Sequence, residues 1–175
     1  MRKINLLAFL TNTIKKIPIY LMISRFVITN KFSQAPIINK KGPTLSLTTH
    51  GFRLKNVYLA IESIARGSLK PSRFMLHLDV EKDVLNPPKT LKRLKNRGLE
   101  IILSENLGPH TKIQPWLINN TEFDKPHVVA DDDIIYPRWW LKKLCNSHSK
   151  NPKIIHTYRS HMMVVDENKK TLTPY

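Results

Sequence analysis

The chain has 175 residues, 41% of them apolar and only five of them glycine, which is enough for one globular domain with an ordered core. Its single cysteine, Cys145, excludes an internal disulfide and permits a reducing compartment such as the cytosol. A formal net charge of +16 indicates an anionic partner, either nucleic acid or an acidic membrane surface.

The positive charge is concentrated at the N-terminus, since no Asp or Glu occurs before Glu62. Uncharged runs there are shorter than the roughly 20 residues that cross a bilayer. We therefore predict a basic amphipathic helix that lies on an anionic membrane, with Pro18 kinking or ending it. The apolar residues that recur at helical spacing are Ile4, Leu7, Leu10, Ile14, Ile17 and Leu21.

Two other interpretations of this segment stay open. A secretory signal would need a small-residue cleavage site, and no convincing one follows. The helix could instead pack on the domain itself. Residues 29–43 are polar and basic and contain Pro36, Gly42 and Pro43, so they predict a linker. We accordingly divide the chain into an N-terminal segment, 1–43, and a domain, 44–175.

Strand and helix patterns alternate along the domain, which predicts an α/β fold with a mostly parallel sheet and crossover helices. Ligands bind such sheets at the carboxyl ends of the strands. Asp79 and the aspartates that begin at Asp131 both fall at predicted strand ends. The expected strands are 44–49, 73–79, 99–104, 127–131 and 153–159, and the expected helices are 54–67, 87–98, 112–119 and 137–148.

The stretch HVVADDDIIYP places three adjacent aspartates, Asp131, Asp132 and Asp133, inside an apolar run. Three interpretations stay open. The carboxylates could chelate a hard divalent cation, could act as an acid and a base, or could form a solvated turn that caps the helix at Trp139. The sequence contains no glycine-rich phosphate loop, which argues against ATP binding by a P-loop or NAD binding by a Rossmann fingerprint. For Trp139 and Trp140, core packing is favoured over stacking on a sugar.

Three segments together resemble a bacterial glycosyltransferase of the family-two type, with the GT-A fold. They are VVADDDIIYPRWWLKKL, KIQPWL, and LSLTTHGFRLKNVYLAIESIARGSLKPSRFMLHLD. The resemblance covers roughly residues 44–165 and is nearest to polysaccharide-biosynthesis members. It implies a Rossmann-like donor-binding half, a nucleotide-diphosphate-sugar donor (a UDP-sugar by default), and Mn2+ or Mg2+ at an acidic DxD element.

The same resemblance assigns roles to individual residues. Asp133 corresponds to the metal ligand, and Asp131 to a contact with the sugar nucleotide that also belongs to the metal site. Donor contacts are implied for a wider set: Thr49, Arg53, Asp79, Lys112, Asp131 and Asp132. The base that deprotonates the acceptor in an inverting transfer is expected beyond Tyr175, so the catalytic residue is unknown and the chain is expected to be C-terminally truncated.

We therefore expect an inverting, metal-assisted hexosyltransferase that is cytoplasmic and peripheral on the inner face of the membrane. Its acceptor would be a polysaccharide or glycolipid, and nucleic acid is not expected as a partner. Two alternatives stay open. The chain could be a catalytically incomplete or degenerate donor-binding fragment, or a basic non-enzymatic protein that binds nucleic acid or membrane.

Overall fold

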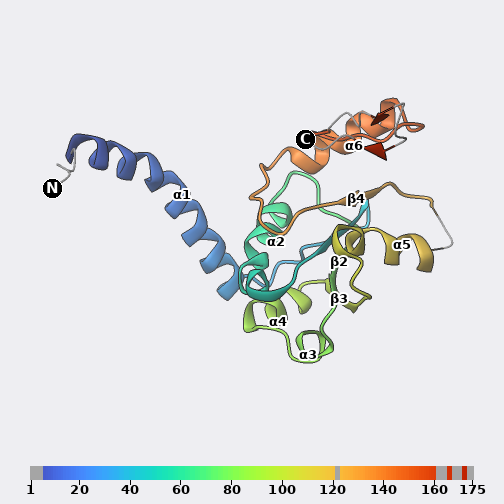
Figure 1. The fold of residues 1–175 in the computed structure, drawn as a ribbon. Helices are drawn as coiled ribbons and strands as arrows, with labels where there is room; N and C mark the ends of the chain where they lie inside the picture. Colours follow the sequence, from blue (N-terminus) through green and yellow to red (C-terminus); the bar gives the residue numbers. More distant parts are fainter. Residues whose placement is uncertain (1–5, 121–122, 161–164, 167–170, 173–175) are drawn as a thin grey trace.

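A four-stranded parallel sheet forms the centre of the molecule (Figure 1). The computed structural model describes residues 6–120, 123–160, 165–166 and 171–172, and the side chains of 18–120 and 123–160. The spatial order of the strands is β3-β2-β1-β4, with every pair parallel. The strands are β1 (Thr44–Thr48), β2 (Arg73–Leu78), β3 (Leu99–Leu103) and β4 (His127–Val129). The predicted α/β class and the first four strands are confirmed, and the arrangement is consistent with a Rossmann-like fold.

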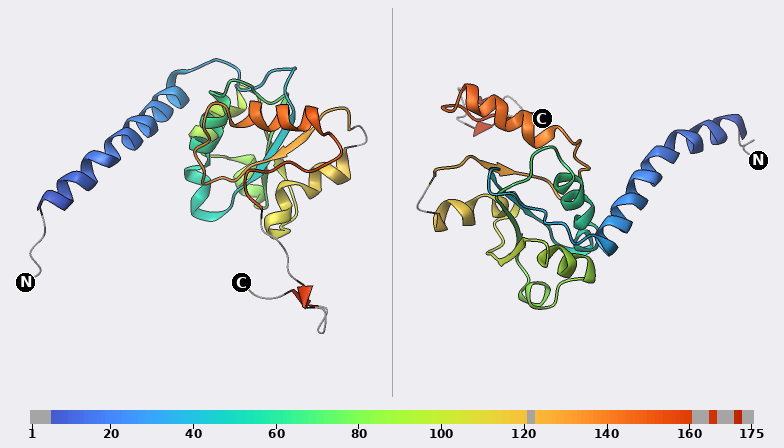
Figure 2. Two further views of the ribbon diagram at one scale, coloured as in Figure 1. Left: turned by 90° about the horizontal axis from the view of Figure 1, so that it is seen from above. Right: turned by 180° about the vertical axis from the view of Figure 1, so that it is seen from behind.

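Helices cover both faces of the sheet (Figure 2). The central strand β1 is therefore buried on both sides. Leu45 and Leu47 belong to the main apolar cluster together with residues of α2 (Val57–Ala65) and α4 (Lys89–Lys95). Ser46, which points to the other face, hydrogen-bonds the backbone carbonyl of Lys112 at the end of the 3-10 helix η2 (Gly108–Lys112). Because side chains alternate between the two faces of a strand, β1 contacts α2 and α4 on one face of the sheet and η2 on the other.

The remaining elements follow the predicted order with small shifts. The N-terminal part of the first predicted helix is a separate 3-10 helix, η1 (Gly51–Lys55), and α3 (Glu81–Leu85) was not predicted. The last two predicted helices are confirmed as α5 (Gln114–Asn119) and α6 (Trp140–Lys150). A short antiparallel pair, β5 (Val165–Asp166) and β6 (Thr171–Leu172), lies outside the main sheet.

The N-terminal helix α1 (Leu6–Phe32) projects from the domain, and the contacts described between them lie in its C-terminal half (Figure 1). It runs through Pro18, so the prediction that this proline could end the helix is wrong. A proline removes one intrahelical hydrogen bond, and a helix can accept that loss with a local bend. Ile4 lies outside the described residues. No helix in the described parts of the chain is long and apolar enough to cross a membrane.

The predicted linker is a packed part of the domain. Its first residues, up to Phe32, complete α1. Ile37 is fully buried, and its backbone N–H donates to the carbonyl of Arg97 at 2.9 Å. At Gly42, an added Cβ would lie 1.8 Å from the carbonyl oxygen of Lys70, so only glycine permits this approach. Composition alone suggested a solvated segment because it does not show which residues meet the core.

A buried polar cluster holds α1 to the domain. Glu62 of α2 accepts hydrogen bonds from both terminal nitrogens of Arg97, at 2.5 and 3.2 Å. Asn30 of α1 donates to Glu62 Oε1 at 3.2 Å and to the carbonyl of Thr90 at 3.1 Å. All three side chains that form the cluster, Asn30, Glu62 and Arg97, are buried. Because α1 supplies one of them, its last turns belong to the folded domain, as the second interpretation of this helix proposed.

The predicted fifth strand, residues 153–159, is absent from the sheet. This segment is irregular, Ile155 is almost fully exposed, and β4 pairs only with β1 among the described residues. β-Branched residues favour a strand, but a strand forms only where a neighbouring strand accepts its hydrogen bonds. The strand prediction for 153–159 is therefore wrong.

Candidate functional site

A cavity of about 320 Å3 opens at the carboxyl ends of the strands. Segments that are far apart in sequence form its wall: the turn after β1, the ends of β2 and β4, and the loop between β3 and η2. The residues that line it are Thr48, His50, Arg53, Asp79, Asn106, Gly108, Pro109, Thr111, Lys112, Ala130, Asp131 and Asp132. The position agrees with the general rule for parallel sheets.

The three adjacent aspartates differ sharply in environment. The side chain of Asp132 is only 5% exposed, whereas those of Asp131 and Asp133 are 51% and 64% exposed. The backbone turns at Asp132 and Asp133, and this turn points the middle carboxylate inward while its two neighbours face the solvent. This division explains how three carboxylates fit into an apolar run.

Asp132 is anchored to the end of β1 through both carboxylate oxygens. The hydroxyl of Thr49 donates to Oδ2 at 2.5 Å, and Arg53 Nη1 donates to Oδ1 at 3.1 Å. Thr49 is fully buried and does not line the cavity. Thr49 and Asp132 thus anchor the aspartate turn to the end of β1. Arg53 both binds Asp132 and lines the cavity.

The two outer carboxylates each face a cation. Lys112 Nζ lies 2.6 Å from Asp131 Oδ1, and both residues line the cavity. Arg53 Nη1 lies 3.9 Å from Asp133 Oδ2, and Asp133 is not among the lining residues. An anionic ligand at this edge would therefore meet two cations that are already close to carboxylates.

Tyr136 fixes the backbone of the aspartate turn. Its hydroxyl accepts a hydrogen bond from the backbone N–H of Asp131 at 2.7 Å, and its own N–H donates to Ser63 Oγ at 2.9 Å. Burial, together with the nearby carboxylates, raises the pKa of Tyr136 to about 12. The hydroxyl therefore stays neutral and holds the backbone of the turn, while the N–H of Tyr136 ties the turn to α2. Sequence reasoning missed this residue, although it lies within the quoted motif.

The far wall of the cavity combines the ends of β2 and β3. Asn106 Nδ2 donates to Asp79 Oδ2 at 2.5 Å, and both side chains line the cavity. Asp79 was predicted from its place at a strand end. The same rule, applied to the loop after the third strand, could have found Asn106.

A half-buried histidine fastens the loop that carries Lys112. His127 Nδ1 and Nε2 each lie 2.8 Å from a hydroxyl of β1, those of Thr44 and Ser46 respectively. Since Ser46 donates to the carbonyl of Lys112, we assign the proton of His127 to Nε2, with Thr44 donating to Nδ1. Burial, followed by the charges of His77 and Arg73, lowers the pKa of His127 to about 4.

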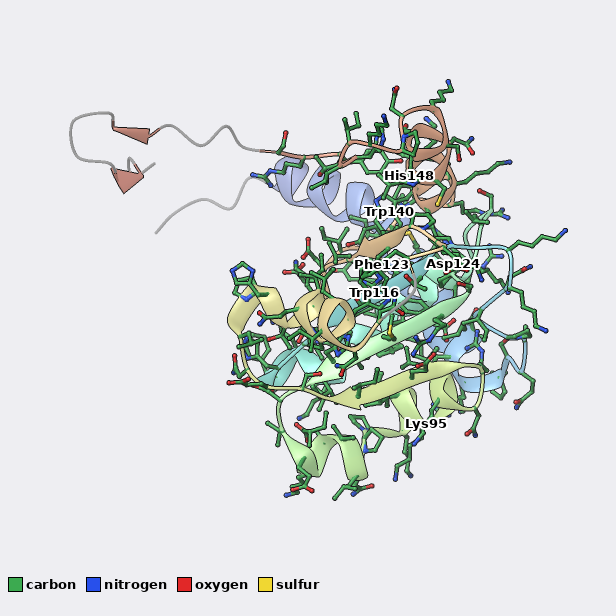
Figure 3. All side chains as sticks on the ribbon, turned by 90° about the vertical axis from the view of Figure 1, so that its right-hand side faces the viewer. Lys95, Trp116, Phe123, Asp124, Trp140 and His148 are labelled. Carbon is green, nitrogen blue, oxygen red and sulfur yellow. The ribbon has the colours of Figure 1, made fainter. Side chains whose placement is uncertain are left out.

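Aromatic rings shield this histidine from solvent. Trp116 stacks on the His127 ring with centroids 3.9 Å apart, and Phe123 meets Trp116 edge-on at 5.3 Å (Figure 3).

Of the two tryptophans in the motif, Trp140 is buried against Tyr136, which confirms core packing for one of them. Trp139 is exposed and lies under Lys143. Trp139 is also the residue that caps α6, and no side chain caps the helix there, so the predicted aspartate cap is wrong.

The carboxylates at this edge do not form a closed metal site. Within the described ranges, no group of three or more His, Cys, Asp or Glu side chains is placed to hold a metal ion. Asp131 and Asp133 each offer exposed carboxylate oxygens, and of these two only Asp131 lines the cavity. Mg2+ commonly takes one or two carboxylates and fills its other positions with waters and phosphate oxygens. The donor set therefore fits a divalent cation that arrives with a phosphate ligand.

Comparison of the chain with protein-family models, curated proteins and solved structures gives no match. The predicted general base, placed beyond Tyr175, lies outside the described residues.

Proposed function

We propose that this chain forms the donor-binding site of a metal-assisted, inverting glycosyltransferase with the GT-A fold. It would transfer a sugar from a nucleotide-diphosphate donor, by default a UDP-sugar, to a polysaccharide or glycolipid. One observation carries the proposal: Arg53, Lys112 and Asp131, which come from three separate segments, converge on one cavity at the carboxyl edge of a parallel sheet. The resemblance of the aspartate motif to family-two enzymes supports the same assignment.

The proposed roles follow from the position of each side chain. Arg53 and Lys112 would contact the diphosphate, since both are cations on the cavity wall. Asp131 and Asp133 would hold Mn2+ or Mg2+, which would supply Lewis-acid stabilisation of the diphosphate leaving group. Asp79, with Asn106, would meet the nucleoside at the far wall.

Electrostatics links donor and cation binding. The acids of the cavity, Asp79, Asp131 and Asp132, outnumber its two cations, so a diphosphate alone would be repelled. A divalent cation between the outer carboxylates and the diphosphate would reverse that balance. The proposal therefore requires donor affinity to depend on the metal.

Calorimetric titration of UDP and UDP-sugars, with and without Mn2+, tests this proposal. We expect binding only with the metal, and at least about tenfold weaker binding for Asp133→Ala. Asp133 is exposed, so the substitution should leave the fold intact. The matched control is Asp124→Ala. This exposed carboxylate (Figure 3) lines a separate cavity with Thr44 and Arg73, the first residues of β1 and β2, at the opposite end of these strands.

Three results would contradict the proposal. They are the absence of UDP binding under every metal condition, equal binding without metal, and an equal loss for Asp124→Ala. Assay of UDP release with a glycan acceptor then separates an active transferase from a degenerate donor-binding fragment. Metal-dependent binding without release would favour the fragment.

We also propose that the domain works at the inner face of the membrane. The support is the charge of the N-terminal third, which contains ten Lys or Arg and no acid up to residue 61. Such a segment is attracted to anionic lipid head groups, and the attraction weakens as the salt concentration rises.

A further inference from the structure

The rotation of α1 about its own axis is fixed by its contacts with the domain. Phe26 is buried and lies under the guanidinium of Arg66, 4.8 Å from the ring centroid. Asn30, one turn later, enters the buried cluster around Glu62. Arg66 also reaches Met22 Sδ at 3.8 Å, one turn earlier. Three residues at four-residue spacing thus face the domain, and the opposite face of this part of α1 must face outward.

That outward face carries a row of large apolar side chains. Leu21, Ile28 and Phe32 are 67%, 59% and 67% exposed. At 3.6 residues per turn, all three lie about 200–240° around the helix from Phe26, so they form one stripe. We call these three residues the outer row.

The outer row continues a pattern that is visible in the sequence. Upstream, Leu10, Ile14 and Ile17 recur at the same helical spacing that reaches Leu21. Because α1 is unbroken from Leu6 to Phe32, one helix carries the whole pattern. Its 27 residues give a rod of about 40 Å that extends from the domain (Figure 2).

The charged residues beside the outer row indicate which kind of partner binds it. Arg25 and Lys31 are exposed on this part of the helix, and Lys31 Nζ lies 5.1 Å from the ring centroid of Phe32. The helix contains no acidic residue. Two copies packed through this face would bring cations against cations without any counter-charge, whereas an anionic lipid surface provides it.

From this geometry we infer that the outer row of α1 is a docking surface for an anionic lipid bilayer. The helix lies in the interfacial plane, with Leu21, Ile28 and Phe32 among the acyl chains and Arg25 and Lys31 at the phosphates. The buried contacts of Phe26 and Asn30 transmit this orientation to the domain. The inference rests on the proposed membrane location and assigns the contact with the membrane to one face of α1. It is independent of the proposed transfer reaction.

Vesicle co-sedimentation of the full chain tests the inference. The probes are vesicles of phosphatidylcholine alone and of phosphatidylcholine mixed with phosphatidylglycerol. We expect binding to the mixed vesicles only, and weaker binding at high salt. The outer-row variant, Leu21→Gln, Ile28→Gln and Phe32→Gln, should bind at least about tenfold more weakly, since glutamine keeps helix propensity but removes the apolar surface.

A matched control removes three exposed apolar side chains elsewhere on the molecule. Leu85→Gln, Ile118→Gln and Ile155→Gln should bind the mixed vesicles as the wild type does. A second variant, Arg25→Gln with Lys31→Gln, should also weaken binding while leaving the outer row intact. Circular dichroism checks that each variant is folded, and UDP titration of the outer-row variant should be unchanged.

Several results would overturn the inference. Equal binding of the wild type and the outer-row variant would do so, as would equal binding to neutral and mixed vesicles. Absence of vesicle binding, together with a dimer in sedimentation equilibrium that the outer-row variant dissociates, would assign the face to a second copy. Failure of UDP to bind the wild type would leave the vesicle result standing, so the two proposals fail separately.

Discussion

Replacement of Arg97 by alanine should be the most destabilising single change in the cluster that holds α1. Arg97 donates to Glu62 through Nη1 and Nη2, and its Nε donates to the carbonyl of Ala35 at 2.8 Å. The two charged side chains are only 5% and 1% exposed. Arg97→Ala would leave the Glu62 carboxylate buried with the Asn30 amide as its remaining described donor.

The expected magnitude follows from this burial. Removal of one partner of a buried ion pair costs about 3–5 kcal/mol, because the other charge stays in a medium of low polarity. An exposed pair of good geometry supplies the contrast. Arg73 binds Glu100 through two nitrogens, at 3.0 and 2.6 Å, but both side chains are well exposed. Arg73→Ala should therefore cost only about 0–1 kcal/mol.

Equilibrium urea unfolding, followed by circular dichroism, measures both costs in the same chain. A double variant, Glu62→Leu with Arg97→Met, should be more stable than Arg97→Ala alone, since it removes both charges and keeps the volume. If Arg97→Ala cost no more than Arg73→Ala, the assignment of a strong buried pair would be refuted. A double variant that lost as much as Arg97→Ala would show that the unpaired Glu62 charge is not the cause of the loss, since the double variant lacks that charge.

Two further predictions concern the candidate site. The pKa of His127 is lowered to about 4 from 6.5, so the unfolded chain takes up this proton first, and the free energy of unfolding should fall by up to about 3 kcal/mol as the pH drops from 6.5 toward 4. Because burial also lowers the pKa of His77, the check compares urea unfolding of wild type and His127→Gln across this range; equal slopes would contradict the prediction. Asp132→Asn should lower the free energy of unfolding by about 1–3 kcal/mol, since it weakens two contacts of a buried carboxylate, whereas Asp133→Asn should change it by less than about 0.5 kcal/mol. Thermal unfolding of the two variants checks the order, and a larger loss for Asp133→Asn would refute it.

The sequence by itself was sufficient for the elements of the sheet and for the edge at which the site lies. Leu45 and Leu47 stand in a short β-branched run between Pro43 and Gly51, and that local pattern predicts the first strand. The alternation of strands with helices then fixed the parallel arrangement. Since all parallel strands end at one edge, Asp79 and the aspartate triplet could be placed at that edge before any coordinates.

The different environments of the three aspartates could not be predicted. All three are the same residue type, so the sequence does not distinguish them. The inward orientation of the Asp132 side chain depends on Thr49 and Arg53, which lie about eighty positions away in the chain. The same reason applies to His127, because its role depends on its contact with Ser46 of β1, which is distant in the sequence.

The errors of prediction have the same physical origin. The segment 153–159 has strand propensity, but no neighbouring strand in the described sheet receives it. Residues 33–43 have the composition of a linker, yet Ile37 fills the core and Gly42 passes against the carbonyl of Lys70. Propensity and periodicity are properties of a few adjacent residues, so the sequence determined most of the elements and their order. Burial and pairing depend on residues distant in the chain, so only the tertiary structure decided which side chains form the cavity and which face of α1 is left exposed.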